Sequence, residues 1–108
     1  GATYAARTTA FHATQMTNYI QKAIAHEGFS LVEAISVCPT YYGRKNKKGS
    51  APSMMNFLKE SFVDVKAADR MTPEQLQGKF LMGEFKHKTD LPEYSTEYQK
   101  IIDRMRKE

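Results

Sequence analysis

The sequence has little cysteine, no tryptophan and no long apolar run. Cys38 is the single cysteine, so a disulfide within the chain is impossible, and a metal bound by this chain could take at most one thiolate. No stretch of eighteen apolar residues occurs, so the sequence predicts no membrane-spanning helix. The first residues lack the basic-then-apolar pattern of a secretion signal, and we therefore expect a cytoplasmic protein.

Several common catalytic patterns are also absent. There is no phosphate-binding P-loop, no GxGxxG sequence and no recognisable carboxylate pair for acid–base catalysis. The three histidines, His12, His26 and His87, show no ligand spacing with each other or with Cys38. We expect each histidine to be structural or to face solvent.

The composition is that of an ordinary globular domain. The chain has 108 residues, of which 41% are hydrophobic and 26% charged, and we expect residues 1–108 to form a single domain with a modest core. The chain begins without Met on a strand-like segment, so we expect a piece of a longer polypeptide. Net charge is +4, and the cations gather in two clusters: Arg44, Lys45, Lys47 and Lys48, then Arg104, Arg106 and Lys107. Such clusters favour anionic partners. A solvated loop explains the first cluster equally well, and a helix end, where cations are favourable, explains the second cluster better.

The first third of the chain predicts a strand–helix–strand unit. Residues 2–7 are rich in strand formers, and Met16, Tyr19, Ala23 and their neighbours recur at helical spacing. Residues 29–38 are apolar on both alternating faces, which is typical of a strand buried inside a parallel sheet. Together they predict a βαβ unit.

The rest of the chain predicts a basic loop over residues 40–50, a short helix after Pro52, and a further helix capped by Thr72 and ended by Gly78. Residues 79–86 form a third predicted strand, and residues 94–105 form an amphipathic helix. The expected fold class is therefore α/β, with a partial, mainly parallel sheet flanked by helices.

Cys38 lies at the carboxyl end of the second predicted strand, just before Pro39. Ligands of open parallel sheets gather outside this edge. Three interpretations stay open: a cofactor ligand, a small buried hydrophobe, or the nucleophile of a thiol enzyme, which a depressed pKa and fast alkylation would favour. The adjacent basic loop, with Tyr41 and Tyr42, also allows an interaction module for acidic or nucleic partners. No DNA or RNA motif accompanies the loop, so we expect no nucleic acid.

Three segments together resemble a known family. GATYAARTTAFH, AIAHEGFSLVEAISVCPTYYGRKNK and LQGKFLMGEF are similar to the end of the beta subunits of 2-oxoacid:ferredoxin oxidoreductases, and nearest to the 2-oxoglutarate members. The spacing of GFS, Glu33 and S-x-C-P-T with a following GR-x-N is the specific part. The resemblance is weakest over residues 64–70 and after Lys86.

The resemblance implies oxidative decarboxylation of a 2-oxoacid on thiamine diphosphate with magnesium, electron transfer through a 4Fe–4S cluster to ferredoxin, and release of an acyl-coenzyme A. It also implies an alpha subunit as partner. The family's GDG motif and its other cluster cysteines would lie upstream of this chain. The chain would then be the carboxyl-terminal portion of a thiamine-diphosphate-binding fold, inactive by itself and without bound cofactor.

Two sites follow from the same resemblance. Cys38 matches the fourth thiolate of the 4Fe–4S cluster in members whose beta subunit holds one, and it would be a free thiol when this chain is alone. Arg44, Lys45, Lys47 and Lys48 would lie near the cluster and could dock acidic ferredoxin. Since the preceding strands would be missing, we also expect self-association through an unpaired sheet edge.

Overall fold

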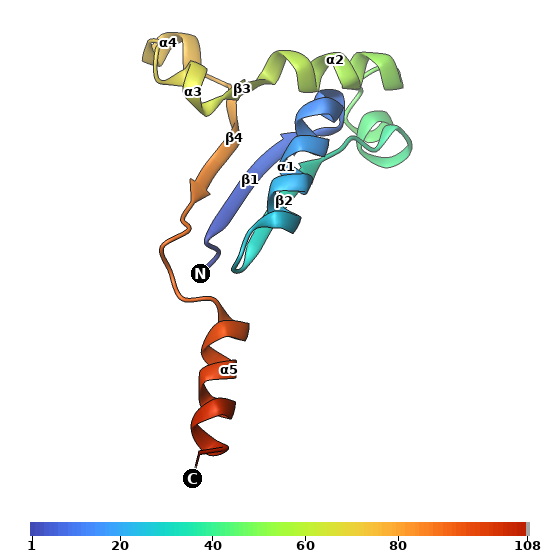
Figure 1. Ribbon diagram of the computed structural model, residues 1–108. Helices are drawn as coiled ribbons and strands as arrows, with labels where there is room; N and C mark the ends of the chain where they lie inside the picture. Colours follow the sequence, from blue (N-terminus) through green and yellow to red (C-terminus); the bar gives the residue numbers. More distant parts are fainter. Residues whose placement is uncertain (108) are drawn as a thin grey trace.

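The computed structural model describes residues 1–107 and shows a mixed α/β domain with a protruding carboxyl-terminal helix (Figure 1). Four strands form one sheet, and helical segments connect them. In chain order the elements are β1 (Tyr4–Thr9), the 3-10 turn η1 (Ala10–His12), α1 (Ala13–Ala25), β2 (Ser30–Ile35), the π-helical turn η2 (Pro39–Gly43), α2 (Ala51–Ser61), β3 (Phe62–Asp64), α3 (Val65–Ala68), α4 (Pro73–Leu76), β4 (Phe80–His87) and α5 (Tyr94–Met105).

The strand order in the sheet is β2-β1-β4-β3. β1 runs parallel to β2, with Tyr4 beside Ser30 and Thr9 beside Ile35. β4 runs antiparallel to β1, and the short β3 pairs with β4 in parallel. Two of the three strand pairs are therefore parallel, which confirms the mainly parallel sheet. The predicted βαβ unit is confirmed as β1–α1–β2, and the third predicted strand is confirmed as β4.

The sheet differs from expectation at β2. Residues 29–38 were expected inside a parallel sheet, yet β2 is an edge strand and Leu31 is 54% exposed. The expectation is wrong for this chain because only β1 pairs with β2, and α1 covers only one face of the pair. Leu31 lies on the other face, across from Ala5. An apolar strand without covering elements therefore stays exposed.

Two small apolar clusters hold the domain together. In the first, Tyr4 and Ala6 of β1 pack against Tyr19 of α1. In the second, Leu58 of α2 and Phe62 of β3 pack with Met82 of β4, together with partly buried residues that include Ile35 at the end of β2. The second cluster fixes α2 across the carboxyl ends of β1 and β2, where Figure 1 draws it above the sheet.

Local sequence signals explain several helix boundaries. Thr72 and Gln75 form the predicted capping box of α4, with the Thr72 hydroxyl accepting from the Gln75 N–H and the Gln75 side chain accepting from the Thr72 N–H. Ser50 caps α2 in the same way by accepting from the Ser53 N–H. The predicted helix over residues 94–105 is confirmed as α5, none of whose residues is buried.

Candidate functional site

Residues 36–38 join the end of β2 at Ile35 to the π-helical turn η2. Cys38 is its first flanking residue, and Pro39 occupies the first position of the turn, where a missing N–H costs nothing. The Gly43 N–H donates to the Cys38 carbonyl oxygen at 2.9 Å and closes the turn. A Cβ atom at Gly43 would lie 2.5 Å from the Met54 sulfur, so this glycine lets η2 pack closely on α2. The cysteine is therefore held between the sheet and α2.

The Cys38 side chain is exposed and is surrounded by backbone donors. The Tyr41 N–H donates to its sulfur at 3.4 Å. Hydrogen bonds from the backbone of Tyr41, and then of Tyr42 and Thr40, lower the pKa of the Cys38 thiol below its usual value. These donors favour the thiolate, which is the form that binds metals. Cys38 lies beyond the carboxyl edge of the sheet, as predicted, but β2 ends three residues earlier at Ile35 and not at Cys38. The interpretation of Cys38 as a buried hydrophobe is wrong, because the residue is exposed.

Cys38 belongs to no cluster of metal-binding side chains within residues 1–107. No group of three or more His, Cys, Asp or Glu side chains in this range is arranged to hold a metal ion. Nor does a histidine nitrogen hydrogen-bond to the sulfur in the described part of the chain. The arrangement thus presents one accessible thiolate without an adjacent general base.

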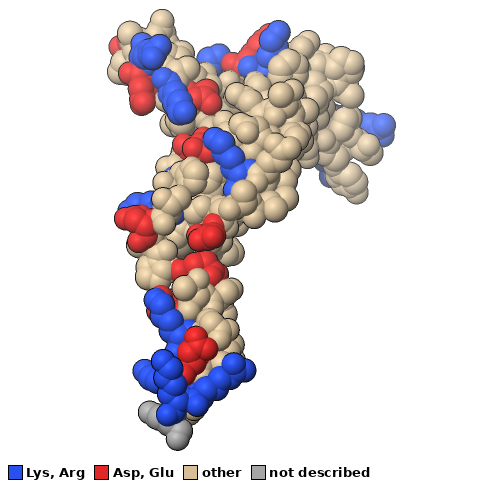
Figure 2. Space-filling view, viewed as in Figure 1, with Lys and Arg blue, Asp and Glu red and all other residues tan. Residues whose placement is uncertain are grey.

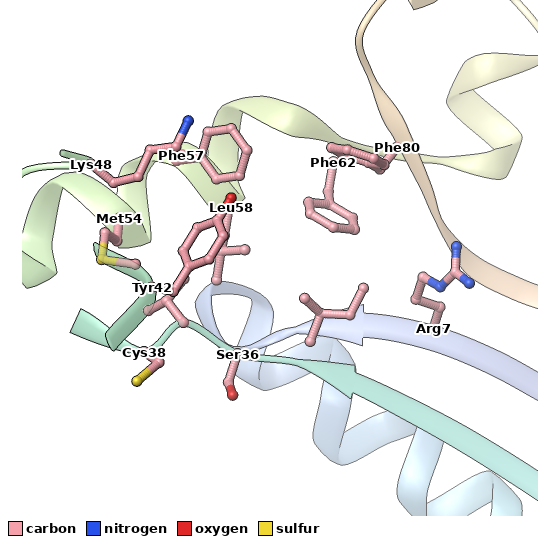
Figure 3. Close-up of a pocket in the computed structure, with 12 residues that line it drawn as sticks. Arg7, Ser36, Cys38, Tyr42, Lys48, Met54, Phe57, Leu58, Phe62 and Phe80 are labelled. Atoms are coloured by element: carbon pink, nitrogen blue, oxygen red, sulfur yellow. The ribbon is translucent and has the colours of Figure 1, made fainter. Parts of the chain in front are cut away.

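A cavity of about 630 Å³ lies beside this turn, between β2, α2 and the start of β4. Its lining is mainly apolar, and Figure 3 shows Met54, Phe57 and Leu58 on one side and Phe62 beside Phe80 on the other. The sulfur of Cys38 points away from these side chains in the same view. Cys38 is thus one of the residues that line the cavity, but its sulfur faces outward from it.

Two cations border the cavity at its opposite ends. Figure 3 shows Arg7 on the β1 side and Lys48 on the α2 side. Arg7 forms an ion pair with Glu33 of the neighbouring strand and donates from Nη1 to the Leu81 carbonyl oxygen at 3.4 Å. Its charge is thus largely compensated within the sheet.

The predicted basic loop (Arg44, Lys45, Lys47 and Lys48) follows η2 directly, and all four side chains are exposed. The Lys45 ammonium lies 5.0 Å from the centre of the Tyr41 ring, and the Lys48 ammonium lies 5.7 Å from that of Phe57. No Asp or Glu occurs between Glu33 and Glu60 in the sequence, and within residues 1–107 none of the four cations pairs with a carboxylate. Figure 2 shows blue side chains without red neighbours at the right edge.

A second polar cluster lies at the opposite end of the sheet and was not predicted. The Glu84 carboxylate accepts from the Tyr4 hydroxyl at 3.1 Å and from the Lys22 ammonium at 2.9 Å. His26 and His87 meet edge to face beside Tyr4, with ring centres 5.5 Å apart. These residues are far apart in sequence, and the pairing of β1 with β4 and the packing of α1 on the sheet bring them together. Sequence spacing therefore gives no signal for the cluster.

The third histidine, His12, is structural as expected. Its Nδ1 lies 2.8 Å from the Thr9 hydroxyl, and burial lowers its pKa. Its side chain does not cap α1. It therefore ties the end of β1 to η1.

Comparison with known proteins bears on this geometry. The chain is 48% identical over 85 residues to 2-oxoglutarate synthase subunit KorB of Methanothermobacter marburgensis, which covers 79% of this chain. It is 42% identical over 103 residues to the KorB subunit of Methanothermobacter thermautotrophicus (95% of this chain) and 41% identical over 108 residues to that of Methanocaldococcus jannaschii (100% of this chain).

The chain is a homologue of KorB. This homology confirms the resemblance to the beta subunits of 2-oxoglutarate:ferredoxin oxidoreductases. The three alignments span 30%, 36% and 40% of the respective KorB relatives, so the chain corresponds to well under half of each. No family model matches the chain, and no solved structure matches it.

The KorB homologue has no helix, in the portion described by the structure, that is long and apolar enough to cross a membrane. Its predicted site residues fall into two adjacent groups. Cys38 and the basic loop lie on either side of η2, so the structure brings the predicted ligand and the predicted docking surface together. The sequence did not predict the apolar cavity beside them, because the apolar residues that line it have the spacing expected of core residues.

Proposed function

We propose that this chain forms the carboxyl-terminal portion of a KorB-type subunit, where it supplies one thiolate to a 4Fe–4S cluster and a basic surface to ferredoxin. The enzyme would decarboxylate 2-oxoglutarate oxidatively, together with an alpha subunit. An acyl-coenzyme A would be released, and two electrons would leave through the cluster. Thiamine diphosphate with magnesium would supply the carbanion chemistry, and we assign none of its ligands to residues 1–108.

The observation that carries this proposal is the environment of Cys38. Its sulfur is exposed, lies at the carboxyl edge of the sheet and accepts a backbone N–H bond from Tyr41. Backbone donors around a ligating sulfur favour the thiolate and tune the potential of the cluster that it holds. A buried, unreactive cysteine would need none of these features.

Cys38 fits one position of a four-thiolate ligand set and cannot fill the others. A 4Fe–4S cluster is held by four thiolates, and this chain has one cysteine. The three remaining ligands would come from residues outside this chain. The homology to proteins of which the chain spans at most 40% is compatible with such residues. The outward direction of the sulfur also leaves space for a cluster beside η2.

The ligand assignment can be tested by substitution in the subunit that contains this chain, purified without oxygen. Cys38→Ala should remove most of the iron and acid-labile sulfide, together with the paramagnetic signal of the reduced cluster. Ser36→Ala is the matched control, because Ser36 lies two residues earlier on the same strand exit and should retain the cluster. Iron content and signal that survive Cys38→Ala would disprove the assignment.

The docking surface requires a separate test. Ferredoxins that receive electrons from such enzymes are acidic, and opposite charges accelerate association more at low salt than at high salt. Reversing Lys45 and Lys47 to Glu should slow ferredoxin reduction about ten-fold at low ionic strength, with a smaller effect at high salt. The matched control reverses Lys66 and Lys88, two exposed lysines outside the loop. Equal rates and salt slopes for both double variants would exclude docking at the basic loop.

A further inference from the structure

The carboxyl-terminal helix α5 carries an apolar stripe that nothing in the described part of the chain covers. Tyr94, Tyr98, Ile101 and Met105 are spaced four, three and four residues apart, and all four are exposed. The Tyr94 and Tyr98 rings stack with centres 5.9 Å apart and planes 10° from parallel, which places both on one face. Alternating spacings of three and four residues are those of a helix that pairs with another helix.

The position of α5 keeps this stripe free. Figure 1 shows the helix beyond the sheet, joined to β4 by a short connection. The radius of gyration is 19.3 Å, whereas a compact chain of this length would have about 13 Å. A helix of twelve residues is marginally stable in water without a packing partner. The formation of α5 therefore calls for an element outside this copy of residues 1–107.

The charges that border the stripe match a second α5 in antiparallel orientation. Such a pair places Tyr98 against Ile101 of the second copy, and Tyr94 against Met105 of the second copy. Glu97 and Arg104 border the stripe on the same side. The two-fold axis then sets Glu97 of each helix opposite Arg104 of the other, and the dimer gains this ion pair twice.

A parallel pair would lack this complementarity. Residues with the same number would then lie at the same height along the pair. Glu97 and Arg104 of one helix would face the opposite border of the stripe on the second helix, which is formed by Ser95 and Ile102. The present partner of Glu97 is Lys100 of the same helix, at 2.7 Å. This ion pair is exposed and therefore contributes little, so it does not prevent Glu97 from changing partner.

The shape of the chain favours the same orientation. α5 is about 18 Å long, and its amino end adjoins the α/β body. Antiparallel pairing places the two bodies at opposite ends of the helix pair, where they do not collide. Parallel pairing would press both bodies together at one end.

We propose that α5 is a self-association element that pairs antiparallel with α5 of a second copy of this chain. The interface consists of the apolar stripe flanked by two Glu97–Arg104 ion pairs. This goes beyond the proposed function, because it needs neither the cluster nor ferredoxin. It also differs from self-association through a sheet edge, since β2 and β3 take no part.

Charge reversal in the full 108-residue chain tests the proposal by sedimentation velocity. Glu97→Arg alone and Arg104→Glu alone should each replace two attractive pairs by two repulsive ones, and so weaken dimerisation about ten-fold. An equimolar mixture of the two single variants should restore dimers, because one helix then presents two cations and the other two anions. Dimers that persist in either single variant, or a mixture that stays monomeric, would overturn the proposal.

A thiol pair distinguishes the antiparallel register from other arrangements. In a Cys38→Ser background, Tyr98→Cys and Ile101→Cys are made in separate chains, mixed and oxidised gently. The antiparallel pair brings the two introduced thiols into one layer, so the cross-linked product should be mainly the mixed dimer. Cross-linking of like chains in preference to the mixed dimer would indicate parallel pairing and refute the assignment. Dimers that survive all of the α5 variants would point to the sheet edge as the interface and would also overturn the proposal.

Discussion

The link between Tyr4 and Glu84 allows a sharp test of what stabilises the sheet. Tyr4 is fully buried in β1, and its hydroxyl donates to the Glu84 carboxylate of β4 at 3.1 Å. Burial raises the pKa of Tyr4, and the hydrogen bond to Glu84 raises it further, so the hydroxyl remains a donor at neutral pH. Tyr4→Phe removes this one bond and leaves the ring in place.

The expected loss in the free energy of unfolding is about 1.5 kcal/mol. Hydrogen bonds to charged groups contribute about 1.5 to 3 kcal/mol, and the lower end applies because the Glu84 side chain is 19% exposed and keeps its bond from Lys22. Tyr19→Phe is the matched control. Tyr19 is 8% exposed, but its hydroxyl makes no hydrogen bond within residues 1–107, so the loss should stay below about 0.5 kcal/mol.

The pH dependence of this difference follows from Glu84. Burial alone would raise the pKa of Glu84, but hydrogen bonds from Lys22 and Tyr4 outweigh burial and lower it. A carboxyl group whose pKa is lowered on folding adds stability above its unfolded pKa of about 4.3, and this stability is lost as the pH falls through the lowered value. The difference in the free energy of unfolding between wild type and Tyr4→Phe should therefore have its full value at pH 7 and should disappear in acid.

Urea unfolding at several pH values measures these quantities. The transition midpoint of Tyr4→Phe should fall while the slope with denaturant stays unchanged, because the buried surface is nearly the same. Equal losses in the Tyr4 and Tyr19 variants would refute the reasoning, because the effect would then come from packing. A stability difference that stays unchanged in acid would show that the Tyr4 hydroxyl does not stabilise the sheet through the Glu84 carboxylate.

Further predictions concern the core, a cap, a turn and the thiol. Leu58→Ala, at a position that is 2% exposed, should cost about 2 to 4 kcal/mol, whereas Leu31→Ala on the bare face should cost less than about 1 kcal/mol; chemical denaturation compares them. Thr72→Ala removes half of a capping box and should cost about 1 kcal/mol in the same assay. Gly83→Ala should destabilise the chain by about 1 to 3 kcal/mol, because its φ of 121° strains any L side chain, and thermal melting would detect the shift. Alkylation of Cys38, followed against pH, should show a midpoint below that of a free cysteine peptide, and an equal midpoint would contradict the backbone donors around the sulfur.

The sequence predicted an element well where the signal for that element comes from its own residues alone. The capping box at Thr72 requires only neighbouring residues, and the stripe of α5 requires only helical spacing, so both were predictable. Pro39 predicted the exit from the sheet near Cys38, since proline cannot donate to a strand ladder, although β2 already ends at Ile35. The β1–α1–β2 unit followed from one periodicity change and a glycine.

Features that depend on distant residues were not predictable in this way. β3 has only three residues and exists because β4 pairs with it, so no sequence period marks it. The antiparallel insertion of β4 between β1 and β3 depends on pairing across the whole chain. The exposure of Leu31 depends on which elements cover the sheet. The Glu84 cluster depends on the same long-range pairing, which explains why its histidines gave no ligand spacing.

The central position of β1 has a consequence for synthesis of the protein on the ribosome. β1 needs β4 on its second edge, and Tyr4 pairs with His87, which is made 83 residues later. At translation rates of about 5 to 20 residues per second, this partner follows after about 4 to 17 s. During this interval β2 is the one partner among the four strands of this sheet that β1 has available, and the edge that β4 later occupies is open to chaperones or to neighbouring nascent chains. The order of strands in the sheet thus sets the earliest moment at which the domain can close.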